Sequence, residues 1–298
     1  MQSFSRGWSF LKQAWGMAFK DKDLLKPSIY ALVVGMVVSV IGIIPLAAAY
    51  FLIGGNSIGN FVLAVMGGIL VFVQFVVTYI FSGMTVYLIY GYLAEGDGRM
   101  DKAWDIVKRD FFDILTLAAA STVVNMLKSA AQKNRKNNIV SSLARSAMGL
   151  LETLWTEASY LILPAMVIDD LNLKDSLQRV WKITKENLLL IGISTVGVRW
   201  VTGLISFVFS MIGLVIAFAI GGGLAYLSGG AAAISIIGIV IGALIFFAFA
   251  MLASIFSSYT NTAYHTCLYI WAREVETAKA EGSTVPVAAP APLAAVLA

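Results

Sequence analysis

The strongest constraint on this chain is a set of long apolar runs with almost no charge. Four of them, residues 28–53, 61–93, 188–220 and 231–271, each exceed the roughly 20 residues that cross the hydrocarbon core of a bilayer. Arg199 is the one Asp, Glu, Lys or Arg within them. A soluble domain would place charged residues in such runs, so the sequence predicts a polytopic membrane protein.

Two weaker segments raise the predicted count to six transmembrane helices. Residues 111–127 contain Asp113 and Asn125, and residues 147–168 contain Glu152 and Glu157. No strand-like alternation accompanies them, so the predicted fold class is all-α. Only 13% of the residues are charged, against roughly 25% in soluble domains, and 12% are aromatic. A disordered chain is excluded, because such chains are rich in charge and poor in aromatic residues.

An internal repeat is expected to organise the six helices into three units. The segment KAWDIVKRDFFDI (102–114) aligns with RVWKITKENLLLI (179–191), which places Trp104 opposite Trp181. KQAWGMAFKDKDLL (12–25) is a looser third copy around Trp15. Each unit would consist of an interfacial helix, a polar elbow and a two-helix hairpin. The predicted divisions are 1–95, 96–168 and 169–272, followed by a flexible Ala/Pro-rich tail at 273–298.

The Trp-bearing helices have the pattern of interfacial anchors. Phe4, Trp8, Leu11, Trp15 and Phe19 recur at steps of three and four, which places them on one helical stripe. Such a helix lies in the membrane interface, with its apolar face toward lipid and its basic face toward anionic headgroups. The predicted anchors are Trp8, Trp15, Trp104, Trp181 and Trp271. Lipid sensing and docking of a partner protein are alternative roles.

The placement of basic residues predicts the orientation. Fifteen of the 21 lysines and arginines lie in residues 1–27, 93–110, 169–187 and 272–281, which six crossings put on one side. The positive-inside rule makes that side cytoplasmic, together with both termini. The stretch 128–145 disagrees, because it contains five basic residues and no acidic one. Either it faces outward, or the third and fourth helices do not cross fully.

Three short motifs resemble known membrane families. WKITKENLLL (181–190), after DSLQRV (175–180), is similar to the S-W-x-L-T-K-x-N elbow of a membrane domain attached to some bacterial glycerophosphodiester phosphodiesterases. The overall plan resembles a bacterial family of six-helix membrane proteins of unknown function, through TVYLIYGYLAEGDG (85–98) and TAYHTCLYIWARE (262–274). This resemblance implies the architecture and a bacterial inner-membrane location. It does not imply phosphodiesterase activity, since the sequence after residue 275 holds no such catalytic domain.

Polar residues inside the predicted spans form the candidate functional site. A charge at the bilayer centre costs roughly 2.5–3.5 kcal/mol, so each one requires an explanation. The candidate intramembrane polar residues are Glu157, Arg199, Glu152, Gln74 and Asn125. Arg199 is the expected partner of Glu157, either as a structural ion pair or as part of an ion pathway. Glu152 and Glu157 lie about 140° apart around their helix, so they do not share a face.

The remaining chemistry is sparse. Cys267 is the only cysteine and His265 the only histidine, which excludes an intrachain disulfide and a Cys- or His-based metal cluster. His265 lies among Tyr264, Tyr269 and Trp271, a pattern typical of an aromatic belt at the interface. We therefore expect no metal, no cofactor, no catalytic residue and no nucleic-acid partner.

Three functions agree with these observations, and the sequence favours the first, with the other two as alternatives. The first is a non-enzymatic scaffold or accessory subunit that associates with the bilayer and with a membrane-protein partner or a second copy of itself. The second is a transporter or channel with a buried Glu157/Arg199 site, because internal repeats are common in transporters. The third is a lipid-binding or lipid-handling protein.

Overall fold

The structure is a computed structural model that describes residues 2–54, 56–133, 139–227, 232–282 and 287–297. Across these ranges it is helical, with short turns and no strand, so the all-α prediction is confirmed. The elements are α1 (Gln2–Lys20), the 3₁₀ turn η1 (Lys22–Leu24), α2 (Lys26–Ile53), α3 (Ser57–Glu95), α4 (Met100–Arg109), α5 (Phe111–Lys133), α6 (Ile139–Asp169), α7 (Leu173–Leu227), α8 (Ala232–Ala280) and α9 (Ala291–Leu297).

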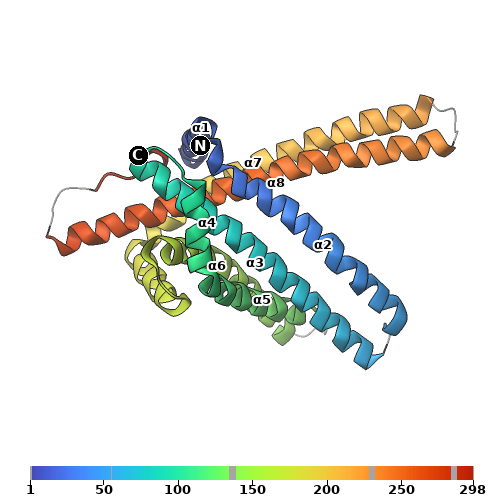
Figure 1. The fold of residues 1–298 in the computed structure, drawn as a ribbon, viewed down its shortest axis with the longest axis horizontal. Helices are drawn as coiled ribbons and strands as arrows, with labels where there is room; N and C mark the ends of the chain where they lie inside the picture. Colours follow the sequence, from blue (N-terminus) through green and yellow to red (C-terminus); the bar gives the residue numbers. More distant parts are fainter. Residues whose placement is uncertain (1, 55, 134–138, 228–231, 283–286, 298) are drawn as a thin grey trace.

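Three helical hairpins extend from a common base (Figure 1). They are α2–α3, α5–α6 and α7–α8, and the first and the last diverge as they leave the base. We call the base the root, where α1, η1, α4 and α9 pack against the hairpins, and we call the hairpin stretches beyond it the arms. Both termini lie at the root. The root is therefore the side of the molecule that corresponds to the predicted cytoplasmic side, where fifteen of the 21 basic residues lie.

The root has a densely packed core. Phe10 and Ala14 of α1 are completely buried, as are Leu88 of α3, Ile162 of α6 and Tyr269 of α8. The ring of Phe10 meets the edge of Tyr264 at 5.5 Å between centroids. Each unit of the chain contributes to this core, so the root joins the three hairpins into one body.

The arms present apolar side chains outward. Phe51 is 85% exposed and Phe218 is 72% exposed, although neither has a polar atom in its side chain. By length and composition, five segments of the described chain can cross a membrane: Lys22–Ile53, Ser57–Glu95, Phe111–Gln132, Val198–Leu224 and Ile236–Ala280. α6 is not among them, because Glu152, Glu157 and nearby polar residues lower its hydropathy. Five candidate spans indicate a multi-pass membrane protein, and the sixth predicted crossing is not established.

The elbow between the Trp-bearing helix and the hairpin differs from one predicted unit to the next. η1 separates α1 from α2, and Asp110 separates α4 from α5. The third predicted elbow is absent, because α7 continues as a single helix from Leu173 to Leu227. The second helix of each of the first two hairpins ends in the left-handed region, at Gly96 (φ 78°) and just after α6 at Asp170 (φ 55°). The threefold repeat therefore remains a prediction.

Two further expectations concern loops and the tail. Of the five basic residues in 128–145, Lys128 has a described side chain, and the other four lie outside the described side chains. Parts of the predicted flexible tail are helical, since α8 reaches Ala280 and α9 packs against α1, and the flexibility of 273–298 stays a prediction. Leu293 and Val296 of α9 are buried, because they cover apolar side chains at the root.

Candidate functional site

A polar cavity lies between the three hairpins, on the arm side of the root core. Its volume is about 610 Å³, and residues from α2, α3, α5, α6, α7 and α8 line it. Twelve of the 23 lining residues carry a hydroxyl group: Ser28, Thr78, Tyr79, Ser82, Ser121, Thr156, Ser159, Tyr160, Ser206, Ser254, Ser257 and Ser258. Asn125, Asn261, Glu152 and Trp155 add further polar groups. This volume falls within the roughly 300–1,000 Å³ range of small-molecule sites.

The cavity wall is held together by its own hydrogen bonds. Ser121 Oγ lies 2.7 Å from the hydroxyl of Tyr79 and accepts a hydrogen bond from Trp155 Nε1 at 2.9 Å. These three residues belong to α5, α3 and α6, so one serine joins three helices. Thr156 donates its hydroxyl hydrogen to the carbonyl of Glu152 at 2.8 Å. Such bonds to the preceding helical turn let hydroxyl groups exist in an apolar surrounding.

Ser206 of α7 is the exception in this wall. Its Oγ is buried and has no hydrogen-bond partner in the described part of the chain. An unpaired hydroxyl away from water costs roughly 1–3 kcal/mol in proteins. Because this oxygen is buried, Ser206 contributes other atoms to the cavity wall and its hydroxyl does not face the open space.

An ionised cluster lies behind one wall of the cavity. Glu157 of α6 forms an ion pair with Arg199 of α7 through Oε1, and its Oε2 lies 3.4 Å from Nε2 of His265 in α8. The other ring nitrogen of His265 lies 2.8 Å from the carbonyl of Asn261. The imidazole stacks on Tyr160, with 4.8 Å between ring centroids. Since Tyr160 and Asn261 both line the cavity, the cluster is in direct contact with its wall.

The structure distributes the predicted polar residues over three places. It pairs Glu157 with Arg199, and it puts Glu152 and Asn125 on the cavity. Glu152 Oε1 also forms an ion pair with Lys128 Nζ at 2.5 Å. Gln74 is elsewhere: its Nε2 donates to the carbonyl of Gly35 at 2.9 Å and to Ser39 Oγ at 2.7 Å, which joins α3 to α2.

His265 is the residue that the sequence analysis misplaced. The interfacial interpretation is wrong, because its side chain is buried at 4% exposure against Glu157. The available signal was the run SIFSSYTNTAYHT (254–266), in which polar residues interrupt an apolar span. In a helix, His265 falls one turn after Asn261 and two turns after Ser258, on the face that lines the cavity.

The five predicted tryptophan anchors lie in two kinds of environment. Trp8, Trp104 and Trp181 are exposed at 52%, 39% and 72%. Trp15 instead packs on α8, where its Nε1 donates to Thr260 Oγ1 at 3.1 Å and its ring stacks on Phe256 at 4.9 Å. Trp271 is half-buried and donates to the carbonyl of Val287 at 3.4 Å. Trp15 and Trp271 thus make contacts inside the molecule, and the role of all five tryptophans as interfacial anchors stays a prediction.

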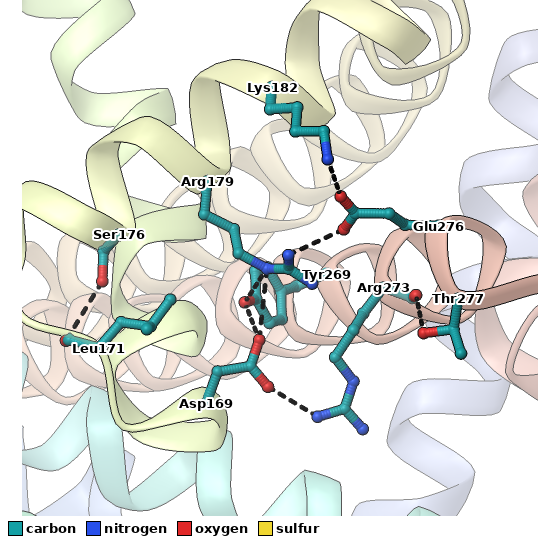
Figure 2. Close-up of polar contacts among 9 residues, drawn as sticks. All are labelled: Asp169, Leu171, Ser176, Arg179, Lys182, Tyr269, Arg273, Glu276 and Thr277. Atoms are coloured by element: carbon teal, nitrogen blue, oxygen red, sulfur yellow. Dashed lines mark hydrogen bonds and ion pairs between the residues drawn. The ribbon is translucent and has the colours of Figure 1, made fainter. Parts of the chain in front are cut away.

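A second polar cluster belongs to the root (Figure 2). Asp169, at the end of α6, accepts a hydrogen bond from the Tyr269 hydroxyl at 2.5 Å and pairs with Arg273 at 2.8 Å. Arg179 of α7 lies 3.4 Å from the same carboxylate and pairs with Glu276 at 2.8 Å. Lys182 also pairs with Glu276, and Arg273 lies over the ring of Tyr90 at 5.7 Å. The cluster thus joins the connection between α6 and α7 to the C-terminal end of α8.

The charge of Arg179 is secured by these neighbours. Burial alone lowers the pKa of the guanidinium, but the bond to Tyr269 and the charges of Glu276 and Asp169 outweigh it and raise the pKa. Each charged side chain in the cluster has an oppositely charged partner within the protein, so we interpret the cluster as structural. Among the described residues, no group of three or more His, Cys, Asp or Glu side chains is placed to hold a metal ion.

The chain matches no model of a known protein family and no curated protein sequence. The interpretation of the cavity therefore rests on its own geometry and chemistry.

Proposed function

We propose that this chain is an inner-membrane protein that binds a small amphiphile or polar solute within the bilayer, as part of lipid handling or transport. The observation that carries the proposal is the cavity of about 610 Å³ with twelve hydroxyl-bearing residues on its wall. A single hydroxyl is tolerated in a bilayer because it bonds to its own helix, but twelve hydroxyl-bearing residues from several helices gathered around one open space form a polar environment that a ligand can use. A pure scaffold has no need of such a cavity.

The position of the cavity supports the same proposal. It lies beyond the root core, among helices that carry exposed apolar side chains on their outer faces. A ligand with a polar headgroup and apolar chains could place the headgroup in the cavity and leave its chains in lipid. The proposal includes cytoplasmic termini, α6 as a sixth crossing, the three-unit plan and the six-helix bacterial family relationship.

An accessory-subunit role is the second candidate. The observation in its favour is the outer face of α1, where Phe4, Trp8 and Phe19 are 47%, 52% and 70% exposed. This face suits the membrane interface or a membrane-protein partner. Co-purification of a stoichiometric partner, lost on replacing Trp8 and Phe19 by serine, would favour this role.

A pair of substitutions on α6 tests the binding proposal. Thr156 lines the cavity, whereas Thr153, one turn away, is exposed, and each donates its hydroxyl hydrogen to a helix carbonyl. Thr156→Trp fills the cavity and Thr153→Trp does not. We expect native mass spectrometry of gently extracted protein to find a bound small molecule in the wild type and in Thr153→Trp.

That molecule should be absent from Thr156→Trp. Equal occupancy in both tryptophan variants, or no bound molecule in the wild type under any mild detergent, would contradict the proposal. Thermal unfolding of both variants serves as the control for folding.

A further inference from the structure

The charges around the cavity are already matched by the protein. Among the described residues that line it, Glu152 carries the one formal charge, and Lys128 neutralises it at 2.5 Å. Behind the wall, Glu157 is paired with Arg199 and contacts His265. An ionic ligand would have to break one of these pairs to find a counter-charge.

An anionic headgroup is poorly suited to this cavity. No Lys, Arg or His occurs among the described lining residues, so a phosphate would have no cation beside it. Burying an unpaired charge is far more costly than burying a hydrogen-bonded neutral group. A cationic headgroup meets the converse difficulty, because the carboxylate of Glu152 is already occupied by Lys128.

The lining is instead suited to a ligand with many neutral hydrogen-bonding groups. A serine or threonine hydroxyl that donates to its own helix still has lone pairs with which to accept from a ligand. The Asn125 and Asn261 amides add donors and acceptors. Trp155 and Tyr160 place aromatic rings among these groups. Sugar rings combine apolar faces with hydroxyl edges, which matches this alternation.

We propose that the cavity binds an uncharged, polyhydroxylated headgroup, either the glycerol or sugar end of a neutral lipid or a free polyol. This inference rests on the proposed function and specifies its ligand class.

Two lipids with identical acyl chains separate the alternatives. Monoglucosyldiacylglycerol offers hydroxyl groups without charge, whereas phosphatidylglycerol offers hydroxyl groups beside a phosphate. We would incubate the delipidated full chain with an equimolar mixture and measure bound lipid by native mass spectrometry. We expect the neutral glycolipid to be retained at least about tenfold better, since an unpaired charge costs more than the 1.4 kcal/mol that a factor of ten represents.

Two variants connect the result to the cavity. Thr156→Trp should abolish retention of the glycolipid, and Thr153→Trp should not. Free glucose and glycerol are tested in parallel as thermal stabilisers, and stabilisation by them that Thr156→Trp removes would identify a free polyol as the source.

The outcomes are distinguishable. Preferential retention of phosphatidylglycerol that Thr156→Trp removes would overturn the neutral headgroup and leave ligand binding by the cavity intact. Retention of either lipid that Thr156→Trp does not change, with no effect of the polyols, would overturn the proposed function itself.

Discussion

The root and the arms are built from the same kind of helix but are stabilised by different physics. At the root, Leu88, Ile162 and Tyr269 are fully buried, and a cluster of ion pairs lies beside Tyr269 (Figure 2). Along the arms, apolar side chains such as Phe51 and Phe218 face outward. Burial at the root gains from the hydrophobic effect, whereas lipid is as apolar as a leucine side chain and gives the arms no such force to pack together.

Because of this difference, we expect stability to depend on the root and ligand binding to depend on the arms. The root holds the molecule together, and the arms are free to diverge around a polar cavity. A change at the root should therefore alter unfolding, and a change on the cavity wall should alter ligand retention.

Replacing Asp169 should destabilise the protein most. In Asp169→Asn the carboxylate that accepts from Tyr269 and faces Arg179 and Arg273 loses its charge, which leaves two guanidinium groups less well compensated. Removing one member of a fully buried ion network typically costs about 3–5 kcal/mol. The side chains of Asp169, Arg179 and Arg273 are 18%, 27% and 28% exposed, so we expect a loss near the lower end, about 3 kcal/mol. The measurement is the free energy of unfolding, or the thermal midpoint, in a fixed mild detergent.

Asp101→Asn is the matched control for this experiment. Asp101 pairs with Arg99 at 2.8 Å, but both side chains are largely exposed on α4. Exposed pairs contribute little, so the control should unfold like the wild type. If Asp169→Asn and Asp101→Asn had equal small effects, the root would not be the source of stability.

Replacing Glu157 should have an intermediate effect. Glu157→Gln removes the charge that faces Arg199 and His265, so Arg199 loses its partner beside the apolar arms. We expect a loss of about 2 kcal/mol, below the full value for a buried pair because Arg199 is half-exposed. Glycolipid retention should stay within about twofold of the wild type, because Glu157 does not line the cavity.

This variant separates the structural interpretation of the Glu157–Arg199 pair from the functional one. Unchanged unfolding together with lost transport or ligand retention would show that the pair acts on the ligand. The double variant Glu157→Gln/Arg199→Gln completes the comparison. If the pair is structural, the double variant should be more stable than Glu157→Gln alone, since no charge is then left unpaired.

Much of the fold follows from the sequence, because span length and charge are properties of each segment alone. The four long apolar runs became helices, and the weak segment with Asp113 and Asn125 became a fifth candidate span. The continuity of α7 could not be inferred, because the alignment with the second unit implied an elbow near Asn187. Repeats conserve patterns of residue types, and small differences in packing decide whether an elbow breaks the helix.

The site was less predictable, since it depends on how helices rotate against one another. Glu157 and Arg199 could be identified from the sequence, because placing a charged side chain inside the bilayer costs free energy. The same argument does not single out serine and threonine, because their hydroxyls bond to their own helix and carry little penalty. The cavity was therefore not predicted. Likewise, α1 has two apolar faces, and the stripe through Trp15 does not reveal that Phe10 and Ala14 are the more deeply buried.

The smallest predicted effects come from one substitution type, glycine to alanine, made in each region. At the root, Gly96 ends α3 with φ of 78°, and a Cβ there would meet no atom within 4 Å. Gly96→Ala should therefore destabilise by about 1 kcal/mol through backbone conformation alone. On an arm, Gly149 lies inside α6 with equally open space around it. Gly149→Ala should stabilise by about 0.5 kcal/mol, because alanine favours a helix interior.

Opposite signs in the two unfolding measurements would show that the root depends on a fixed turn, whereas the arms depend only on continuous helix. Destabilisation by both substitutions would mean that Gly149 is a point of contact with another helix. The division between a packed root and freely diverging arms would then be wrong for the α5–α6 hairpin.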